Sequence, residues 1–326
     1  MKKILVTGAN GFIGKTLCEH LAAKGYFVRG VFRSKLKSKQ CAICNEHVIV
    51  DDIGPETSWD EALKDIDIVI HLAARVHVMK EKASDALFEY RKVNLEGTKR
   101  LAEKASNAGV RKFIYLSTVK VNGEKTYDKP FSEEDFPFPE DEYGLSKMEA
   151  EQVLRKIADA TSMQIIVLRV PLVYGPGVKG NFLRLLDLVK KGIPLPFANL
   201  TNKRSFVYLG NLVSAISTSI DASIGSFEIF LVNDDQSFST TELITVIAEK
   251  MKKKPMFMPI PQIVVKYICK VLKKTKEIDR LFSSLRIDGK KIRTELNWEP
   301  TFSAEEGINE TVRWFNSIRK NNKGVL

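Results

Sequence analysis

The chain has 326 residues, of which 44% are hydrophobic and 28% are charged, and its formal net charge is +11. These values are ordinary for a soluble globular protein, and the length suggests about two domains. No apolar run approaches the roughly 18–20 residues that a membrane-spanning helix needs, and Lys2 and Lys3 precede only a short strand. We therefore expect no integral membrane segment, no signal peptide, and a cytoplasmic protein whose four cysteines are reduced thiols.

The first predicted strand runs into a glycine-rich turn. In residues 3–14, KILVTGANGFIG, the apolar run Ile4–Val6 is followed by three glycines and then by a helical pattern. A dinucleotide-binding fingerprint requires this order of strand, turn and helix. Gly8 permits the sharp turn, Gly11 lets the backbone approach a pyrophosphate, and Gly14 lets the helix pack closely on the strand. The cofactor-binding residues expected in this turn are Gly8, Asn10, Gly11, Phe12, Ile13 and Gly14.

Strands and helices alternate through the first half of the chain. The apolar runs that predict strands are Ile4–Val6, Phe27–Phe32, His47–Val50, Ile66–Leu72, Phe113–Leu116 and Ile165–Val170. The patterns that predict helices are Phe12–Lys24, Trp59–Leu63, Leu87–Ala108 and Glu142–Ala158. This alternation predicts an α/β fold, a Rossmann-type doubly wound parallel sheet whose strands are buried on both faces.

The pattern changes after Pro171. The elements expected there are helix Phe182–Lys190, strand Ser205–Leu209, helix Leu212–Ile220, strand Phe227–Val232, helix Thr240–Met251 and helix Ile308–Ile318. We expect a smaller C-terminal α/β substrate domain that returns some elements to the main sheet. The expected domain boundaries are 1–170 plus about 205–233 for the dinucleotide-binding domain, with 171–204 and 234–326 for the substrate domain.

Two segments leave alternatives open. Cys41, Cys44 and His47 have metal-like spacing but lack a second ligand pair, so small residues in a connection are favoured over zinc. Met256–Lys276 mixes apolar and basic residues; a lid or core helix with a basic outer face is favoured over contact with a membrane surface. The positive charge as a whole favours solvated faces and a polyanionic small ligand, because no nucleic-acid motif accompanies it.

Tyr143 and Lys147 open a predicted helix, in the sequence YGLSK. Residues four apart share a helix face, so the phenol and the ammonium can point into one cleft. A nearby cation favours the phenolate, and the pair therefore gives a proton donor or acceptor usable near neutral pH. A surface tyrosine beside a surface lysine is the alternative.

Several motifs, in order, together resemble one enzyme family. They are TGANGFIG, HLAA at His71–Ala74, VNLEGT at Val93–Thr98, YLST at Tyr115–Thr118, YGLSK at Tyr143–Lys147, the later VPLVYGPG, and ELNW at Glu295–Trp298. Over essentially the whole chain they resemble the extended short-chain dehydrogenase/reductases that act on nucleotide-sugars, such as UDP-glucose 4-epimerase and dTDP-glucose 4,6-dehydratase.

This resemblance implies roles for individual residues. Tyr143 would be the catalytic acid/base, Lys147 would bind the nicotinamide ribose and lower the pKa of the tyrosine, and Thr118 would hydrogen-bond the reacting sugar oxygen. Asn94 would be structural. The further cofactor-binding residues implied are Asp52, Ile53, Leu72, Ala73, Ala74, Ser117 and Pro171. The substrate-binding residues implied are Asn181 and Arg204, with Arg280 and Arg286 as weaker candidates for a phosphate contact, for each of which a surface ion pair is the alternative.

The chain departs from the family pattern at three places. Asn122 replaces the tyrosine of the usual V-Y-G, and Leu172 stands where epimerases and dehydratases have a substrate-side asparagine. Val119 and Lys120 follow Thr118, so the glutamate that dehydratases need for water elimination is absent. The last departure argues against a 4,6-dehydratase.

The loop after the second predicted strand bears on the choice of cofactor. NAD selectivity normally comes from an acidic residue there, but no carboxylate lies between Glu19 and Glu46. Arg33 is the expected contact for a 2′-phosphate, assisted by Lys35 or Lys37, with a merely basic surface loop as the alternative. We therefore expect NADP(H), with NAD as the other possibility.

The segments STVKVNGE and LVYGPGVKGNF and the ending RIDGKKIRTELNW resemble a bacterial subgroup of UDP-4-keto-6-deoxy-N-acetylhexosamine 4-reductases and UDP-glucose 4-epimerase-like proteins. With the basic loop, this resemblance makes an NADP(H)-dependent reductase of a UDP-4-keto-6-deoxy-N-acetylhexosamine in surface-polysaccharide biosynthesis the leading hypothesis. The alternative is an NAD-dependent 4-epimerase of UDP-glucose or a UDP-N-acetylhexosamine that uses the same residues reversibly. A non-catalytic nucleotide-sensing or RNA-binding protein is disfavoured by the intact Tyr143, Lys147 and Thr118. The expected partners are a UDP-sugar and a second copy of the chain in a homodimer, with no nucleic acid and no metal.

Overall fold

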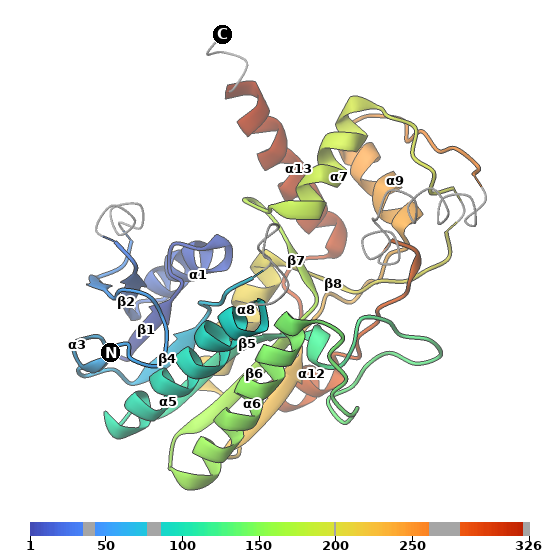
Figure 1. The fold of residues 1–326 in the computed structure, drawn as a ribbon. Coiled ribbons are helices and arrows are strands. Elements are labelled where there is room, and N and C mark those ends of the chain that lie inside the picture. Colours follow the sequence, from blue (N-terminus) through green and yellow to red (C-terminus); the bar gives the residue numbers. More distant parts are fainter. Residues whose placement is uncertain (35–42, 77–85, 199, 261–280, 322–326) are drawn as a thin grey trace.

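The main element of the fold is a seven-stranded parallel sheet (Figure 1). The structure is a computed structural model that describes residues 1–34, 43–76, 86–198, 200–260 and 281–321. The strand order β3-β2-β1-β4-β5-β6-β9 runs outward from β1 in both directions, which is the doubly wound arrangement predicted from the sequence. The strand bounds are β1 Lys3–Thr7, β2 Phe27–Phe32, β3 Glu46–Ile49, β4 Ile68–His71, β5 Lys112–Thr118, β6 Gln164–Val170 and β9 Phe227–Leu231. The predicted α/β Rossmann-type fold class is confirmed.

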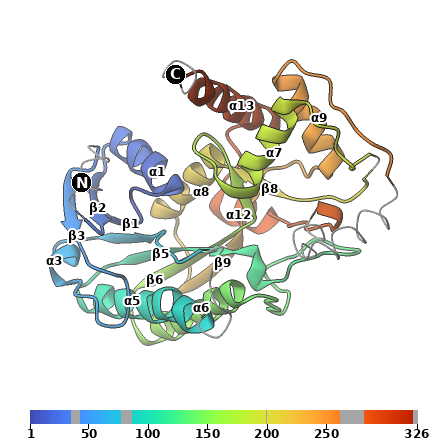
Figure 2. The same ribbon diagram turned by 45° about the horizontal axis from the view of Figure 1, so that its top comes forward.

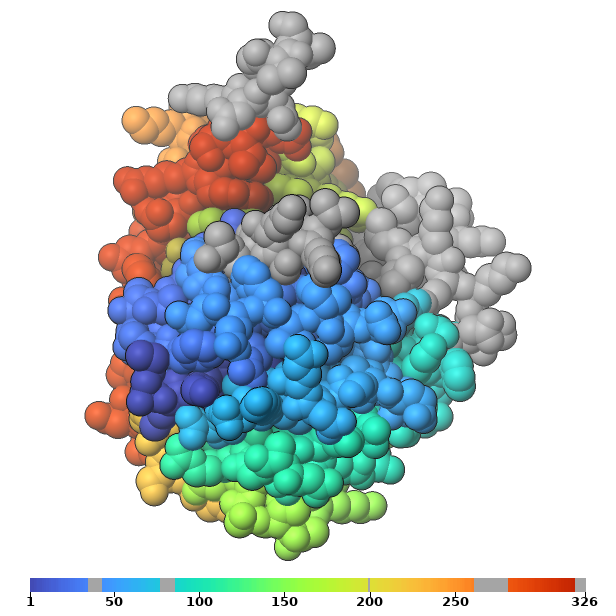
Figure 3. All heavy atoms as spheres, turned by 90° about the vertical axis from the view of Figure 1, so that its left-hand side faces the viewer, coloured from blue at the N-terminus to red at the C-terminus, as the bar shows by residue number. Residues whose placement is uncertain are grey.

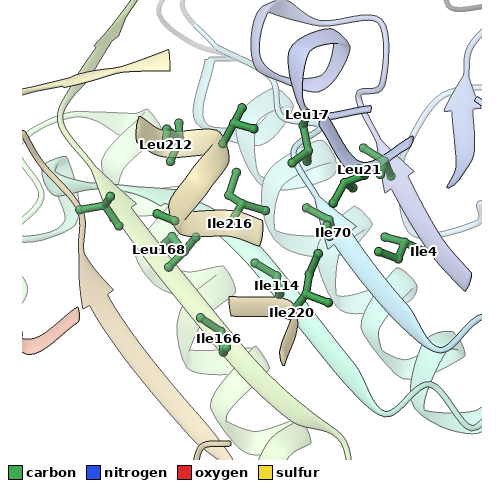
Figure 4. Close-up of a cluster of buried hydrophobic side chains, with 14 of the residues drawn as sticks. Ile4, Leu17, Leu21, Ile70, Ile114, Ile166, Leu168, Leu212, Ile216 and Ile220 are labelled. Atoms are coloured by element: carbon green, nitrogen blue, oxygen red, sulfur yellow. The ribbon is translucent and has the colours of Figure 1, made fainter. Parts of the chain in front are cut away.

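Helices cover both faces of this sheet (Figure 2). One face carries α1 and α8, and the other carries α3, α5 and α6. Their bounds are α1 Phe12–Ala23, α3 Asp60–Leu63, α5 Gly97–Asn107, α6 Glu142–Ala160 and α8 Leu209–Asp221. Because successive strand residues point to opposite faces, Ile4 belongs to the first layer and Leu5 to the second. Figure 4 shows the first layer, where Leu17 of α1 and Ile216 of α8 pack over the sheet.

A third buried cluster lies among the C-terminal helices. It joins Phe182, Ile247 and Phe315 from three helices to Tyr174 and Tyr208 of a separate two-stranded parallel sheet, β7-β8. The remaining bounds are β7 Leu172–Tyr174, α7 Gly180–Lys191, β8 Phe206–Tyr208, α9 Thr240–Lys250, α12 Lys290–Leu296 and α13 Ala304–Asn321. The short strand predicted near residue 206 therefore pairs with β7, whereas β9 returns to the main sheet. The expected boundaries of the two domains stay a prediction.

The helix predicted over Leu87–Ala108 is interrupted by a π-helical turn. It consists of α4 (Ala86–Tyr90), the π turn η1 (Arg91–Glu96) and α5. Asn94 lies in this turn; its side chain accepts a hydrogen bond from the Arg75 N–H at 2.8 Å and donates to the Arg75 carbonyl at 3.1 Å. It also donates to the Ser146 hydroxyl of α6 at 3.0 Å. Asn94 thus holds the chain after β4 against the helix that carries Tyr143, and π turns often occur at functional sites.

Some sequence predictions fall on residues outside the described ranges. These residues are Lys35, Lys37, Cys41, Arg280 and most of Met256–Lys276. Over the described part of the chain, no group of three or more His, Cys, Asp or Glu residues is placed to hold a metal ion. No helix there is both long and apolar enough to cross a membrane.

Figure 3 shows the face where the blue N-terminal residues lie between the red C-terminal helix and the green middle of the chain.

Candidate active site

The predicted cofactor residues lie at the carboxyl-terminal ends of the strands of the main sheet. In a parallel sheet all strands end on the same side, so the residues that follow them are brought together. The glycine turn follows β1, Arg33 follows β2, and Asp52 and Ile53 follow β3. Leu72, Ala73 and Ala74 follow β4, whereas Ser117 and Thr118 end β5 and Pro171 follows β6. The structure therefore gathers residues from six strands that the sequence separates by up to about half its length.

The turn between β1 and α1 has the geometry that a pyrophosphate cradle needs. Gly8 has φ of +70°, which a side chain would strain, and a Cβ there would lie 3.0 Å from the Ala73 nitrogen. A Cβ on Gly14 would lie 2.1 Å from the Gly8 carbonyl oxygen, so only glycine allows α1 to approach β1 this closely. The N-terminus of α1, capped by the backbone of Gly11, points its N–H groups toward this turn. The residues present therefore fit a dinucleotide.

Arg33 and Asp52 face one another across the ends of β2 and β3. The Arg33 guanidinium lies 3.9 Å from the Asp52 carboxylate, and both side chains are well exposed. Since β2 and β3 are neighbours in parallel register, this contact follows directly from the strand order. The acidic group that the β2 loop itself lacks is thus supplied by the next strand. An adenosine ribose at this edge would meet a guanidinium and a carboxylate together, a pairing that reasoning along the sequence had missed.

Tyr143 lies in the first turn of α6. Asp141 caps this helix, because its side chain accepts the Gly144 N–H at 2.7 Å. The Tyr90 ring of α4 packs edge-on against the Tyr143 ring, with centroids 6.1 Å apart. Burial raises the pKa of the phenol, and the charge of Asp141 and the neighbouring Tyr90 raise the pKa further. The free protein therefore holds the phenol protonated, whereas the family resemblance had implied that Lys147 lowers its pKa.

Lys147 is one helical turn further along α6 and is 1% exposed. Its ammonium lies 4.0 Å from the centre of the Tyr115 ring, a cation–π contact with the end of β5. Burial lowers the pKa of Lys147 to about 7, and the carboxylate of Glu151 opposes this decrease. A pKa near 7 means that Lys147 is protonated in only part of the molecules at neutral pH. The effect of Lys147 on the pKa of Tyr143 stays a prediction from the family resemblance.

Beneath Tyr115 lies a buried histidine that the sequence did not mark as functional. The His71 ring stacks on the Tyr115 ring with centroids 5.7 Å apart, and its two nitrogens contact the Thr7 hydroxyl at 2.7 Å and the Thr98 hydroxyl at 3.0 Å. Burial lowers the pKa of His71 to about 3, so the ring is neutral. The stacked rings of His71 and Tyr115 thus lie next to the ammonium of Lys147, with Tyr115 in direct contact with it.

Thr118 ends β5 with its hydroxyl oxygen accepting the Lys120 N–H at 3.3 Å. Its own O–H proton stays available for an oxygen of the substrate. The preceding Ser117 instead donates its hydroxyl to Glu151, which forms a buried ion pair with Arg169 at 2.6 Å. The Ser117 hydroxyl is thus hydrogen-bonded to another side chain of the protein, and its role in binding the cofactor stays a prediction.

The predicted substrate residues lie on other parts of the chain than the residues described so far. Asn181 is an exposed residue in the first turn of α7. The Arg204 guanidinium donates to the Ser283 carbonyl at 3.1 Å, and Arg286 donates to the carbonyls of Tyr127 and Asp128. The structure thus gives Arg286 a backbone role that the sequence did not suggest. The roles of Asn181 and Arg204 in substrate binding stay predictions.

The three departures from the family pattern also have places in the structure. Asn122 is buried, and its side-chain oxygen accepts from Arg169 at 3.1 Å. Leu172 begins β7 and is 43% exposed. Lys120 follows Thr118 in the short 3-10 helix η2 (Val119–Val121).

Comparison with known proteins identifies the family. The model of the NAD dependent epimerase/dehydratase family matches residues 4–232, and the chain belongs to this family. A UDP-glucose 4-epimerase from Vibrio cholerae is 41% identical over 99% of this chain and 97% of its own length. A dTDP-4-dehydro-6-deoxyglucose reductase from Escherichia coli is 28% identical over 95% of this chain and 96% of its own.

Solved structures agree with this assignment. The UDP-glucuronic acid 4-epimerase of Bacillus cereus in complex with UDP-glucuronic acid and NAD has a TM-score of 0.77 at 25% identity, covering 97% of this chain and 99% of that one. The protein is thus an NAD(P)-dependent enzyme of the extended short-chain dehydrogenase/reductase type that acts on a nucleotide-sugar.

Proposed function

We propose that this protein is a 4-epimerase of a UDP-hexose or UDP-N-acetylhexosamine. The observation that carries the proposal is the 41% identity, along nearly the whole of both chains, to a relative named UDP-glucose 4-epimerase. The sequence alone had favoured a 4-keto reductase, but the relative named as a reductase is less similar, at 28%. The order of the two hypotheses is therefore reversed.

The geometry of the site supports the chemistry of epimerisation. A bound NAD(P) would supply the acceptor and donor of the hydride at C4. The phenolate of Tyr143, which the positive charge of an oxidised nicotinamide would favour, takes the proton from the 4-hydroxyl, and the resulting phenol later returns it, while Thr118 donates a hydrogen bond to the same oxygen. Such a donor stabilises the negative charge that develops on the oxygen. Lys147 holds its ammonium beside this group over the Tyr115 ring, where it can bind the ribose of the dinucleotide.

One observation favours the reductase as the second candidate. Arg33 is 65% exposed at the end of β2, where it can reach a 2′-phosphate, and freely exchanging NADP(H) suits a net reduction. Asp52 lies 3.9 Å from this guanidinium, however, and offers an acceptor for a ribose hydroxyl. We therefore propose that NAD is accepted as well as NADP(H), and that an epimerase retains its dinucleotide through the catalytic cycle.

The experiment that separates the two candidates uses the purified full-length protein. UDP-glucose and UDP-N-acetylglucosamine are incubated separately with it and NAD, and the anomeric protons of both epimers are followed by NMR. The epimerase proposal predicts an equilibrium mixture of C4 epimers from at least one sugar without net change in NAD. Oxidation of NADPH by a UDP-4-keto-6-deoxy sugar, without any epimer, would instead establish the reductase.

The same preparation tests the remaining expectations about partners. We propose that the working form is a homodimer and that its ligand is a UDP-sugar. Light scattering after size-exclusion chromatography measures the mass of the particle directly. A mass near twice 36.8 kDa supports the homodimer, and a mass near 36.8 kDa rejects it.

A further inference from the structure

Lys120 joins the two parts of the chain that carry Thr118 and Tyr143. It lies in η2, two residues after Thr118, and its side chain is 18% exposed. Its ammonium forms ion pairs with Asp141 and, at 2.7 Å, with Glu124. Its own backbone N–H contacts the Thr118 hydroxyl. One residue thus touches both the strand end and the helix start of the site.

Asp141 is the intermediary between Lys120 and Tyr143. One oxygen of its carboxylate accepts the Gly144 N–H at 2.7 Å, and the other accepts the ammonium of Lys120. The backbones are also close, because a Cβ on Gly144 would lie 3.0 Å from the Lys120 carbonyl oxygen. The negative charge that caps α6, two residues before Tyr143, is therefore paired with the ammonium of Lys120.

We propose that Lys120 is a positioning residue for the proposed reaction, which neutralises the Asp141 cap and so eases the transfer of the proton from Tyr143. The inference rests on the proposed function, in which Tyr143 is the acid/base. An uncompensated carboxylate at residue 141 opposes a second negative charge on the phenol two residues later. The ammonium of Lys120, paired with Asp141, reduces this opposition.

Several other titratable groups surround Tyr143 or its neighbour Lys120. Tyr90 of α4 lies edge-on to its ring, and Tyr115 of β5 interacts with it electrostatically. Lys147 lies one turn along the same helix, and Glu124 shares the ammonium of Lys120. Glu124 adds a further negative charge once that ammonium is removed. The loss of Lys120 therefore leaves two carboxylates, Asp141 and Glu124, without the cation that they share.

The test is a spectroscopic titration of Tyr143 in full-length protein with saturating NAD. The phenolate absorbance of each variant is taken as the difference from the same variant carrying Tyr143→Phe. Lys120→Gln should move the titration to higher pH by about 1 unit, and Asp141→Asn, which retains a capping side chain, should move it to lower pH. The double variant Lys120→Gln/Asp141→Asn should titrate within about 0.3 units of the wild type.

The pH dependence of kcat/KM for epimerisation should move in parallel with the absorbance. A shift of the titration in protein that fails to epimerise would support the role of Lys120 and reject the epimerase proposal, so the two failures are distinguishable. Lys120→Gln that titrates at the wild-type pH would overturn the inference. So would a double variant that remains shifted with Lys120→Gln, because Lys120 would then not act through Asp141.

Discussion

The Glu151 carboxylate of α6 lies 2.6 Å from the Arg169 guanidinium at the end of β6, and these side chains are only 5% and 3% exposed. Arg169 also reaches Asn122, and Glu151 accepts the hydroxyl of Ser117. The pair therefore fastens the helix that carries Tyr143 to the strands that end at the active site. Glu151 lies one turn after Lys147 on α6.

Breaking the buried Glu151–Arg169 ion pair should destabilise the folded protein. Arg169→Met leaves the Glu151 carboxylate buried without its cation, and we expect the free energy of unfolding to fall by about 3–5 kcal/mol in urea titrations. The matched control is Arg91→Met, which breaks the partly exposed Arg91–Glu149 pair of the same helix, where Arg91 is 43% exposed. Its loss should cost less than about 1 kcal/mol. Equal losses in the two variants would contradict the role of the buried pair.

The depressed pKa of Lys147 predicts a stability that depends on pH. Its pKa is about 7 in the folded protein against an ordinary lysine value of 10.5, so between these values the unfolded chain binds a proton that the folded protein lacks. Below pH 7 the folded state carries the full cost of the buried cation. Lys147→Met should therefore raise the free energy of unfolding by roughly 2–4 kcal/mol at pH 6, with the difference shrinking as the pH approaches 10.

Urea titrations at several pH values between 6 and 10 measure this difference. Lys290→Met is the control, because Lys290 is 86% exposed. The control should change stability little at any pH. A Lys147→Met variant that is no more stable than the wild type at pH 6 would refute the assignment of an unfavourable buried charge.

The glycine turn should tolerate no side chain at Gly14. Gly14→Ala places a Cβ where it meets the Gly8 carbonyl oxygen at 2.1 Å, so α1 must move away from β1 and the N–H groups that face the dinucleotide move with it. We expect the affinity for NAD to fall at least about 10-fold in calorimetry. Gly225→Ala, where the nearest atom would be 3.6 Å away, should leave the affinity unchanged. Equal affinities for all three proteins would exclude this turn as the dinucleotide cradle.

Arg33 tests the preference for NADP(H) that the sequence predicts. Arg33→Ala removes the guanidinium at the end of β2, and we expect the Kd of NADPH to rise about 10-fold while that of NADH changes less than about 2-fold. Arg313→Ala removes a guanidinium of similar exposure, 70%, on α13 and serves as the control. A parallel change for both dinucleotides would show that Arg33 does not read the 2′-phosphate.

Tyr143→Phe removes the proton donor while keeping the ring that packs on Tyr90. The epimerisation rate should fall by about 10²–10⁴, because general acid–base catalysis contributes that much. NAD affinity should persist, since the cradle is formed by the turn after β1. Tyr127→Phe is the control, because Tyr127 is 82% exposed. Unchanged turnover in Tyr143→Phe would remove the phenol from the mechanism.

Local patterns predicted the fold well because they are short-range signals. The run Ile4–Val6 with its three glycines and the four-residue spacing of Tyr143 and Lys147 needed only strand and helix geometry. Contacts between residues of different strands and helices could not be predicted from such local patterns. Arg33 meets Asp52 because β2 and β3 are neighbours, and Glu151 meets Arg169 because α6 packs over β6.

The raised pKa of Tyr143 had a similar cause. The sequence places Lys147 beside the phenol but does not reveal that the phenol is itself buried, which raises its pKa, or that burial against Tyr115 lowers the pKa of Lys147. The π turn at Asn94 likewise depends on a tertiary contact with the Arg75 backbone. Burial and tertiary contacts thus determine the pKa values of the site residues. Residue spacing along the chain predicts only which side chains lie on the same face of a helix.

The most direct measurement follows the hydrogen at C4 of the substrate. UDP-glucose or UDP-N-acetylglucosamine deuterated at C4 is incubated with the purified protein and unlabelled NAD, and the product is analysed by NMR and mass spectrometry. Epimerisation with a retained dinucleotide predicts a C4 epimer that keeps its deuterium, because the same hydride returns to the carbon it left. An absence of epimer, or a product whose hydrogen comes from added NADPH, would contradict the proposed 4-epimerase.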